Sequence, residues 1–196
     1  MLVNPIFIAM QQPEVLVVDY DPTWKNHFEE IKSKLLPNLE SYDIDIQHVG
    51  STSVPGLAAK PVIDIDIIAL DASQIPAILE AILSLGYTHL GDLGIKGREA
   101  FKKIDLPNET PWFRHNLYLG FKDAPSIQNH LKLKAFLLAN PDVAKAYGDL
   151  KKELAEKYAS NRALYTEKKS DFILGILEKL GFNSELLEDI RDQNKA

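Results

Sequence analysis

The chain has 196 residues, and its 28 acidic and 22 basic side chains give a formal net charge of −6. This length can hold one full core with a helical appendix, and two large domains are not expected. The acidic balance argues against a protein that coats a nucleic-acid duplex, although it is compatible with a local basic pocket. Cysteine is absent, which excludes disulfides and thiolate metal sites and fits a reducing cytoplasm.

The first ten residues, MLVNPIFIAM, are apolar but lack the basic region of a signal peptide and contain Pro5. We interpret residues 1–12 as a flexible leader. No later stretch is apolar for the roughly 18 residues that a membrane helix requires. The sequence therefore predicts a soluble, cytoplasmic protein without a membrane partner.

The first elements follow from local patterns. Residues 15–20 (VLVVDY) predict a short strand, and Asp21 predicts the start of a helix, because it can cap a helix whose first position is Pro22. That helix is expected to reach about Leu36. Residues 43–49 alternate polar and apolar side chains, which is typical of a half-buried strand.

The next segment holds a turn, a strand and a helix. Residues 51–60 (STSVPGLAAK) predict a short helix or a structured turn, and residues 61–70 predict a strand that is nearly continuous in Val and Ile. A helix is expected from near Ser73 to a C-cap at Gly86, because glycine readily adopts the backbone conformation that ends a helix.

The remaining elements fall into three strands and then three helices. The predicted strands cover residues 87–92, 98–106 and 114–122, and the predicted helices cover residues 126–140, 142–159 and 166–181, with a weak amphipathic helix over 184–196. The layout is a mixed sheet with two inserted helices and a C-terminal helical bundle, an α+β fold. We expect residues 13–125 to form the core and residues 126–196 to pack on it as one compact unit.

The span from residue 48 to residue 68, HVGSTSVPGLAAKPVIDIDII, concentrates the chemically informative residues. A helix starting after Gly50 would point backbone N–H groups and the hydroxyls of Ser51 and Thr52 at a phosphate. Asp64 and Asp66 are two residues apart on a predicted strand, so their carboxylates share one face. Two such carboxylates suit Mg²⁺ or Mn²⁺, and a bound cation would offset the cost of burying them.

Each of these patterns also has an ordinary structural interpretation. The pair Asp43 and Asp45 shows the same alternation on the preceding strand without a catalytic meaning, and GSTSVPG contains the residues of a common loop. The order of strand, Gly-Ser turn and strand with two aspartates is more specific than either pattern alone.

That order resembles the signature of the GrpB family, a branch of the nucleotidyltransferase superfamily. The similarity continues through YDPTW (20–24), LGY (85–87), HNLYL (115–119) and ALYTEKKSDFI (163–173). The resemblance implies a nucleotidyltransferase-like fold with Gly50 and Ser51 in the Gly-Ser turn. It also implies that Asp64 and Asp66 are the first two metal-binding acids.

Members of the superfamily commonly carry a third acid on a later strand, and here that strand reads RHNLYLGF. Its Asn116 and Tyr118 share one face, which we expect to look at the two aspartates. The missing carboxylate weakens the case for ordinary two-metal transfer. Asp92 and Glu99 are the alternatives for a third ligand.

Further candidates are residues that could hold phosphate or metal. Lys60 and Arg114 are expected to add positive charge beside a triphosphate. Accessory candidates are His48, His115, Asn116, Tyr118, Arg162, Tyr165 and Lys169. Each has a structural alternative, since a lone histidine is often satisfied by packing and charges on an amphipathic helix usually face solvent.

We predict a metal-dependent nucleotidyltransferase that moves a nucleoside monophosphate from a nucleoside triphosphate to an unidentified acceptor, with Mg²⁺ or Mn²⁺ as the cofactor. One alternative is a non-catalytic module that binds a nucleotide or a coenzyme A precursor, because GrpB-like domains also occur appended to dephospho-coenzyme A kinases. Another is a scaffold whose helical bundle binds a protein partner. No residue stands out as the base that activates the acceptor.

Overall fold

The computed structural model describes residues 15–105, 110–182, 187–188 and 191. The expected leader and most of the expected helix over 184–196 lie outside these residues. One mixed sheet has the strand order β1-β2-β5-β4-β3. Its strands are β1 (Ile44–Val49), β2 (Ile63–Ala69), β3 (Tyr87–His89), β4 (Arg98–Lys103) and β5 (His115–Phe121).

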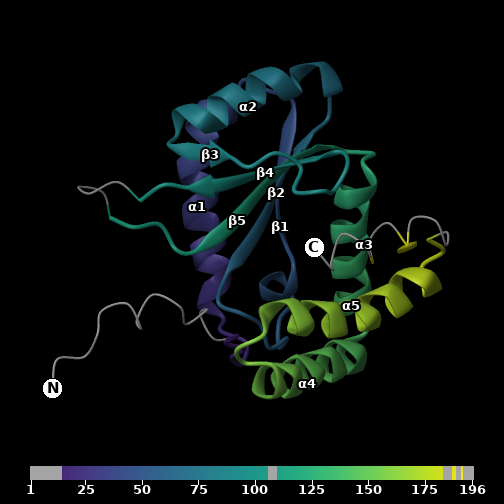
Figure 1. Cartoon of the computed structure of the whole chain (residues 1–196). Coiled ribbons are helices and arrows are strands. Elements are labelled where there is room, and N and C mark those ends of the chain that lie inside the picture. The colour runs from purple at the N-terminus through teal and green to yellow at the C-terminus, as the bar shows by residue number, and fades with distance from the viewer. Residues whose placement is uncertain (1–14, 106–109, 183–186, 189–190, 192–196) are drawn as a thin grey trace, which may run out of the picture.

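The helices are α1 (Thr23–Leu39), α2 (Ile75–Ser84), α3 (Pro125–Ala139), α4 (Pro141–Lys157) and α5 (Arg162–Lys179), with 3₁₀ turns η2 (Ser51–Ser53) and η3 (Ala72–Gln74). Helices α1 and α2 occur before and between the strands in the sequence, and α3, α4 and α5 come after the last strand (Figure 1). The α+β class predicted from the sequence is confirmed. None of the helices in the described ranges has the length and apolar character needed to cross a membrane.

The strand predicted over residues 15–20 does not form. Residues 15–20 form only an isolated antiparallel bridge, in which Val18 and Ala59 exchange both backbone hydrogen bonds. The ladder stops because the next N–H on one side would have to come from Pro61, which has none.

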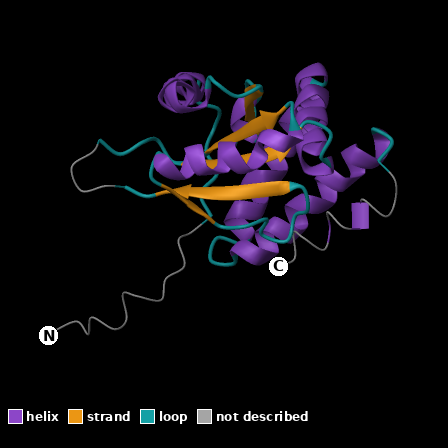
Figure 2. Cartoon of the chain, turned by 90° about the horizontal axis from the view of Figure 1, so that it is seen from above, coloured by secondary structure: helices purple, strands orange, loops and turns teal. Residues whose placement is uncertain are grey.

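Strand β2 separates two environments. The side chains of Ile63, Ile65 and Ile67 are fully buried in the main core, where α1 and α2 supply Trp24 and Ile78 among others. The opposite face of the sheet packs against α3, where Ile68 meets Ile127. Figure 2 shows the strands from above with helices on both sides.

The last three helices assemble on the chain segment that follows η2. Val54 and Leu57 of that segment share a buried cluster with Leu137 of α3, Tyr147 of α4 and Ile176 of α5. This packing brings α4 and α5 close to η2. The two aspartates of β2 therefore lie on the face of the sheet that these helices approach.

Candidate functional site

Asp64 sits beside Asn116 on the adjacent parallel strand. The register of β2 and β5 pairs Asp64 with Asn116 and Asp66 with Tyr118, which confirms that this face of β5 looks at the aspartates. The Asn116 amide Nδ2 donates to Asp64 Oδ1 at 2.7 Å. Burial raises the pKa of Asp64, and the Asn116 hydrogen bond opposes that rise.

Gly50 lies directly against the Asp64 carboxylate. Its backbone has φ +69° and ψ −171°, a combination that is accessible almost only to glycine. A Cβ atom at this position would stand 2.3 Å from Asp64 Oδ2. The glycine thus allows the turn to close onto the carboxylate.

The turn after Gly50 is a single 3₁₀ turn of three residues, so it offers no extended helix terminus for a phosphate. The Thr52 hydroxyl is buried, lying 2.9 Å from His48 Nε2 and donating to the carbonyl of Val62 at 3.3 Å. The Ser53 hydroxyl donates to the Gly50 carbonyl at 2.7 Å. Both hydroxyls therefore serve the turn itself.

Ser51 differs from its two neighbours because its hydroxyl accepts a hydrogen bond from Lys151 Nζ at 2.8 Å. Lys151 is 2 % exposed and lies over the Tyr147 ring, 4.4 Å from its centroid. It comes from the buried stripe of α4, between Gly148 and Leu154. A lysine on an otherwise apolar helical stripe is a sequence signal for this residue, and our sequence reasoning missed it.

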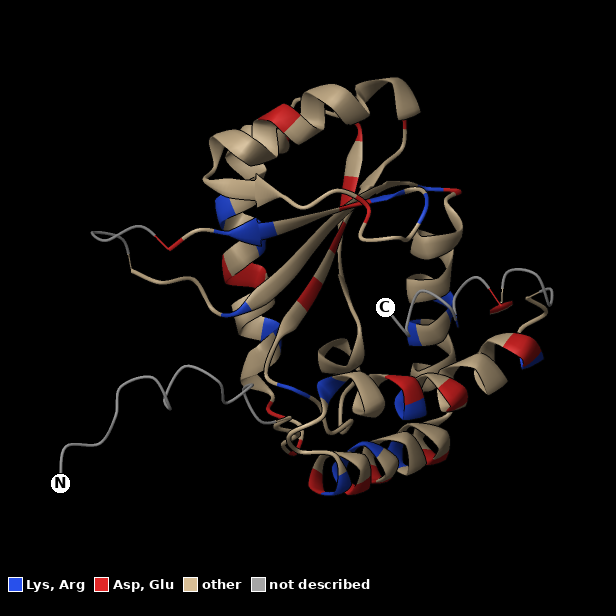
Figure 3. Cartoon of the chain, viewed as in Figure 1, with Lys and Arg blue, Asp and Glu red and all other residues tan. Residues whose placement is uncertain are grey.

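A first pocket of about 380 Å³, the basic pocket, opens beside Asp64. Five basic side chains line it: Lys60, Arg114, Lys151, Arg162 and Lys169. Of these five, all but Lys151 were predicted from the sequence, and the lining also contains the predicted residues Ser51, Thr52, Asp64, Asn116, Tyr118 and Tyr165. Figure 3 shows acidic residues on β2, and both basic and acidic residues on α4 and α5.

The positive charges of the basic pocket repel one another. The pKa of Lys60 falls to about 8 because of burial and the neighbouring charges of Lys169, Arg162 and Arg114. The pKa of Lys151 falls to about 6, mainly through burial and then through Lys169. A polyanion in this pocket would relieve both effects.

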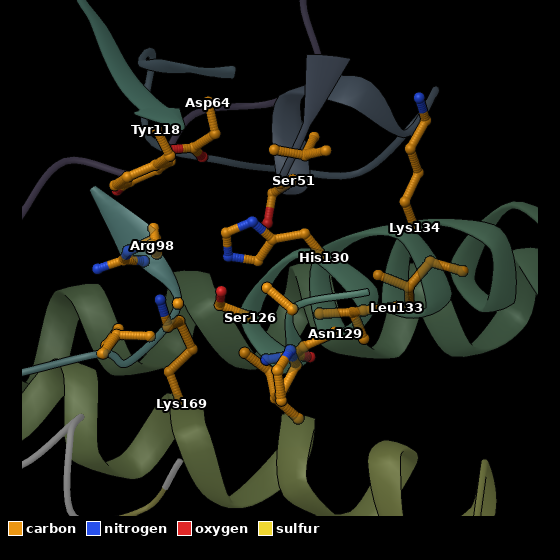
Figure 4. Close-up of a pocket in the computed structure, with 18 of the residues that line it drawn as sticks. Ser51, Asp64, Arg98, Tyr118, Ser126, Asn129, His130, Leu133, Lys134 and Lys169 are labelled. Atoms are coloured by element: carbon orange, nitrogen blue, oxygen red, sulfur yellow. The ribbon is translucent and has the colours of Figure 1, made fainter. Parts of the chain in front are cut away.

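A second pocket of about 530 Å³, the apolar pocket, lies between α3, α5 and the loop before β4 (Figure 4). Its apolar lining includes Ile95, Leu133, Leu137 and Ile173, and its polar lining includes Arg98, Ser126, Asn129, His130 and Lys134. The two pockets share Ser51, Asp64, Tyr118 and Lys169. Asp64 therefore stands where they meet.

Asp66 has a partner that the sequence analysis missed. Its carboxylate is fully buried, and His130 Nδ1 donates to it, at 2.9 Å from Oδ2 and 3.1 Å from Oδ1. Burial lowers the pKa of His130, but the Asp66 charge and hydrogen bond outweigh burial, so the net pKa is raised. Asp66 lines neither pocket, and its role as a metal ligand stays a prediction.

Two predicted histidines lie outside both pockets. His48 stacks on Phe28 with ring centroids 4.9 Å apart, and burial followed by the Lys134 charge lowers its pKa to about 4. His115 Nδ1 donates to the Phe113 carbonyl at 2.7 Å, and its Nε2 lies 2.7 Å from the Tyr87 hydroxyl. Both side chains lie on the core side of the sheet, away from the two pockets, and their accessory roles stay predictions.

The alternative third acids also lie elsewhere. Glu99 accepts a hydrogen bond from His89 at 2.6 Å, and Asp92 accepts one from the Gly94 backbone at 2.8 Å. Neither lines the two pockets. Within the described ranges, no group of three or more His, Asp or Glu side chains is arranged to hold a metal ion.

Comparison with known proteins shows which family the chain belongs to. The family model described as GrpB protein matches residues 14–179. The chain belongs to the GrpB family. This GrpB-family chain is 34 % identical over 175 residues to the glutamate-rich protein GrpB of Alkalihalophilus pseudofirmus, covering 88 % of this chain and 99 % of that protein.

Solved structures of a GrpB protein and of a poly(U) polymerase have folds similar to that of this chain. The GrpB protein of Enterococcus faecalis superposes with a TM-score of 0.69 at 29 % identity, covering 85 % of this chain and all of that one. The Cid1 poly(U) polymerase bound to MgATP superposes with a TM-score of 0.57 at 14 % identity, covering 84 % of this chain and 52 % of that one. The GrpB-family chain therefore has a nucleotidyltransferase-like fold.

One relative bears on the coenzyme A alternative. A dephospho-CoA kinase of Mycolicibacterium paratuberculosis is 34 % identical over 79 residues, which is 39 % of this chain and 19 % of that protein.

Proposed function

We propose that this protein transfers a nucleoside monophosphate from a nucleoside triphosphate to a small acceptor. The observation that carries the proposal is the position of Asp64, where the basic pocket meets the apolar pocket. The basic pocket would hold the triphosphate, and the acceptor would approach from the apolar pocket. The nucleotidyltransferase-like fold supports nucleotidyl transfer as the class of reaction.

The side chains of the basic pocket suit the phosphate groups. Arg114 and Arg162 can each offer two parallel N–H donors to phosphate oxygens, and Lys60 and Lys169 supply compact positive charge. In the proposed reaction the oxygen of an acceptor hydroxyl bonds to the α-phosphorus, the hydroxyl proton passes to water, and the bond to the pyrophosphate oxygen breaks so that pyrophosphate leaves. These charges would then stabilise the departing pyrophosphate.

In the proposed function a divalent cation would arrive with the nucleotide and would be bound by one carboxylate of the protein, that of Asp64. Asp64 reaches both pockets, whereas Asp66 is occupied by His130. Mg²⁺ in nucleotide sites is commonly held by one or two carboxylates together with phosphate oxygens and water. Such a cation would offset charge on the transferring phosphoryl group.

The test is to incubate the purified full chain with each [α-³²P]-labelled nucleoside triphosphate, Mg²⁺ or Mn²⁺, and a nucleotide-depleted small-molecule extract. We expect pyrophosphate release together with label in a new, acceptor-linked product. Nucleotide binding without release would favour a binding module instead. If no nucleotide binds at millimolar concentration, both the transferase and the nucleotide module are wrong.

A second candidate is the non-catalytic binding module for nucleotides or coenzyme A precursors. Two observations favour it. Asp66 accepts a hydrogen bond from His130, and the uncharged amide of Asn116 lies beside Asp64, where a third carboxylate would add charge. The likeness to a dephospho-CoA kinase points to the same ligands. Binding of dephospho-coenzyme A in competition with a triphosphate, without turnover of either, would support this candidate.

Proton uptake should accompany triphosphate binding. Lys60 and Lys151 have pKa values near 8 and 6 in the free protein, and a bound polyanion would raise both. At pH 7.5 Lys151 is largely neutral, so binding should draw in up to about one proton per site. Calorimetry in buffers of different ionisation enthalpy measures this number. A value of zero or a net release would contradict a triphosphate in the basic pocket.

The Asn116→Asp variant should bind Mn²⁺ more tightly than the wild type when no nucleotide is present. The new carboxylate would face Asp64 across the β2–β5 pair, and metal affinity rises with ligand charge. We expect a gain of about tenfold, read by calorimetric titration. Unchanged affinity would show that the Asp64 face is not the metal site.

A further inference from the structure

The apolar pocket contains polar atoms that the protein itself leaves without partners. In the described part of the chain these are Arg98 Nε, Ser126 Oγ and Asn129 Oδ1, and all three residues line this pocket. Arg98 is 7 % exposed and Ser126 is 8 % exposed. Buried polar atoms are rarely left unpaired, so these three are the groups to which a molecule bound in this cavity would hydrogen-bond.

Arg98 defines the charge of that ligand. Its guanidinium lies over the Tyr118 ring, 4.3 Å from the centroid. The two nearby aspartates are engaged elsewhere, Asp64 with Asn116 and Asp66 with His130. A buried guanidinium without a carboxylate is costly unless it meets an anion, and its planar fork matches a carboxylate.

The other two unpaired groups and the apolar lining indicate the remaining chemical features of the ligand. Asn129 Oδ1 can only accept a hydrogen bond, so it calls for an O–H or N–H group, while Ser126 can donate or accept. The aliphatic walls suit an apolar body. Figure 4 shows Arg98, Ser126 and His130 around one space, with Asp64 and Tyr118 beside it.

We propose that the apolar pocket binds a small organic acid that has an apolar body and carries a hydroxyl group, with its carboxylate on Arg98. This proposal deepens the proposed function. The identification of this acid as the acceptor rests on that function, whereas its binding does not. Binding of the acid requires no nucleotide. The binding test therefore stands even if no transfer is found.

The probe is hexanoate, with hexanamide as the neutral control of the same shape. NMR titration of the ¹⁵N-labelled full chain without nucleotide should show hexanoate binding at least about tenfold more tightly than hexanamide, because a charge-assisted hydrogen bond is stronger than a neutral one. The Arg98 Nε–H signal should shift with hexanoate. Equal affinities, or no shift at Arg98, would overturn the proposal.

Two variants separate this pocket from its neighbour. Arg98→Gln should abolish the preference for hexanoate and leave triphosphate binding intact, whereas Arg114→Gln should weaken triphosphate binding and keep the hexanoate preference. The ligand-free Arg98→Gln protein should melt at the wild-type temperature or up to about 2–4 °C higher, because an unpaired buried charge is removed. A preference that survives in Arg98→Gln, or a lower melting temperature, would contradict the assignment.

Discussion

The Asp64→Asn variant is expected to lose the proposed nucleotidyl transfer by on the order of 10³-fold, because Asp64 would hold the cation that offsets developing charge, and loss of one such preorganised contribution has an effect of this size. Asp64 is the carboxylate shared by the two pockets. Under the proposed function Mn²⁺ should raise the melting temperature of the wild type, since a ligand stabilises only the state that binds it, and the same variant should lose that rise.

The fold should survive this substitution. Burial raises the pKa of Asp64, so the folded protein disfavours the charged form and a neutral amide of the same shape removes that penalty. Asp43→Asn, an exposed acid before β1, is the matched control and should behave like wild type. Equal Mn²⁺ shifts in the wild type and in Asp64→Asn would refute the assignment of the metal to Asp64.

Gly50→Ala is expected to lower both stability and triphosphate affinity. The backbone conformation of Gly50 costs other residues about 1–3 kcal/mol. In addition the new methyl group would stand 2.3 Å from Asp64 Oδ2, so the carboxylate or the turn must move. Thermal unfolding and calorimetric titration with a triphosphate measure the two effects.

The Gly56→Ala variant is a control that introduces backbone strain without a steric contact to Asp64. Gly56 also has positive φ, +79°, but a Cβ there would meet nothing within 4 Å. This control should lose stability through backbone strain alone and bind triphosphate normally. If Gly50→Ala binds triphosphate as well as Gly56→Ala does, the close approach of the turn to Asp64 is structural only.

The local sequence determined the parts of this protein that depend on periodicity. The two-residue spacing on β2 predicted that Asp64 and Asp66 oppose the isoleucines, and the same spacing on β5 predicted which face Asn116 takes. The order of elements also followed from local patterns, because helices and amphipathic strands bury one face at a fixed period.

Only the tertiary structure decided which side chains meet across these faces. Period two places Asp66 on a face but says nothing of α3, which brings His130 to it from 64 positions away. Lys151 reaches Ser51 from 100 positions away, and Arg98 enters the apolar pocket from β4. Such contacts depend on how helices pack on the sheet, and packing is set by the whole core rather than by the residues near each aspartate.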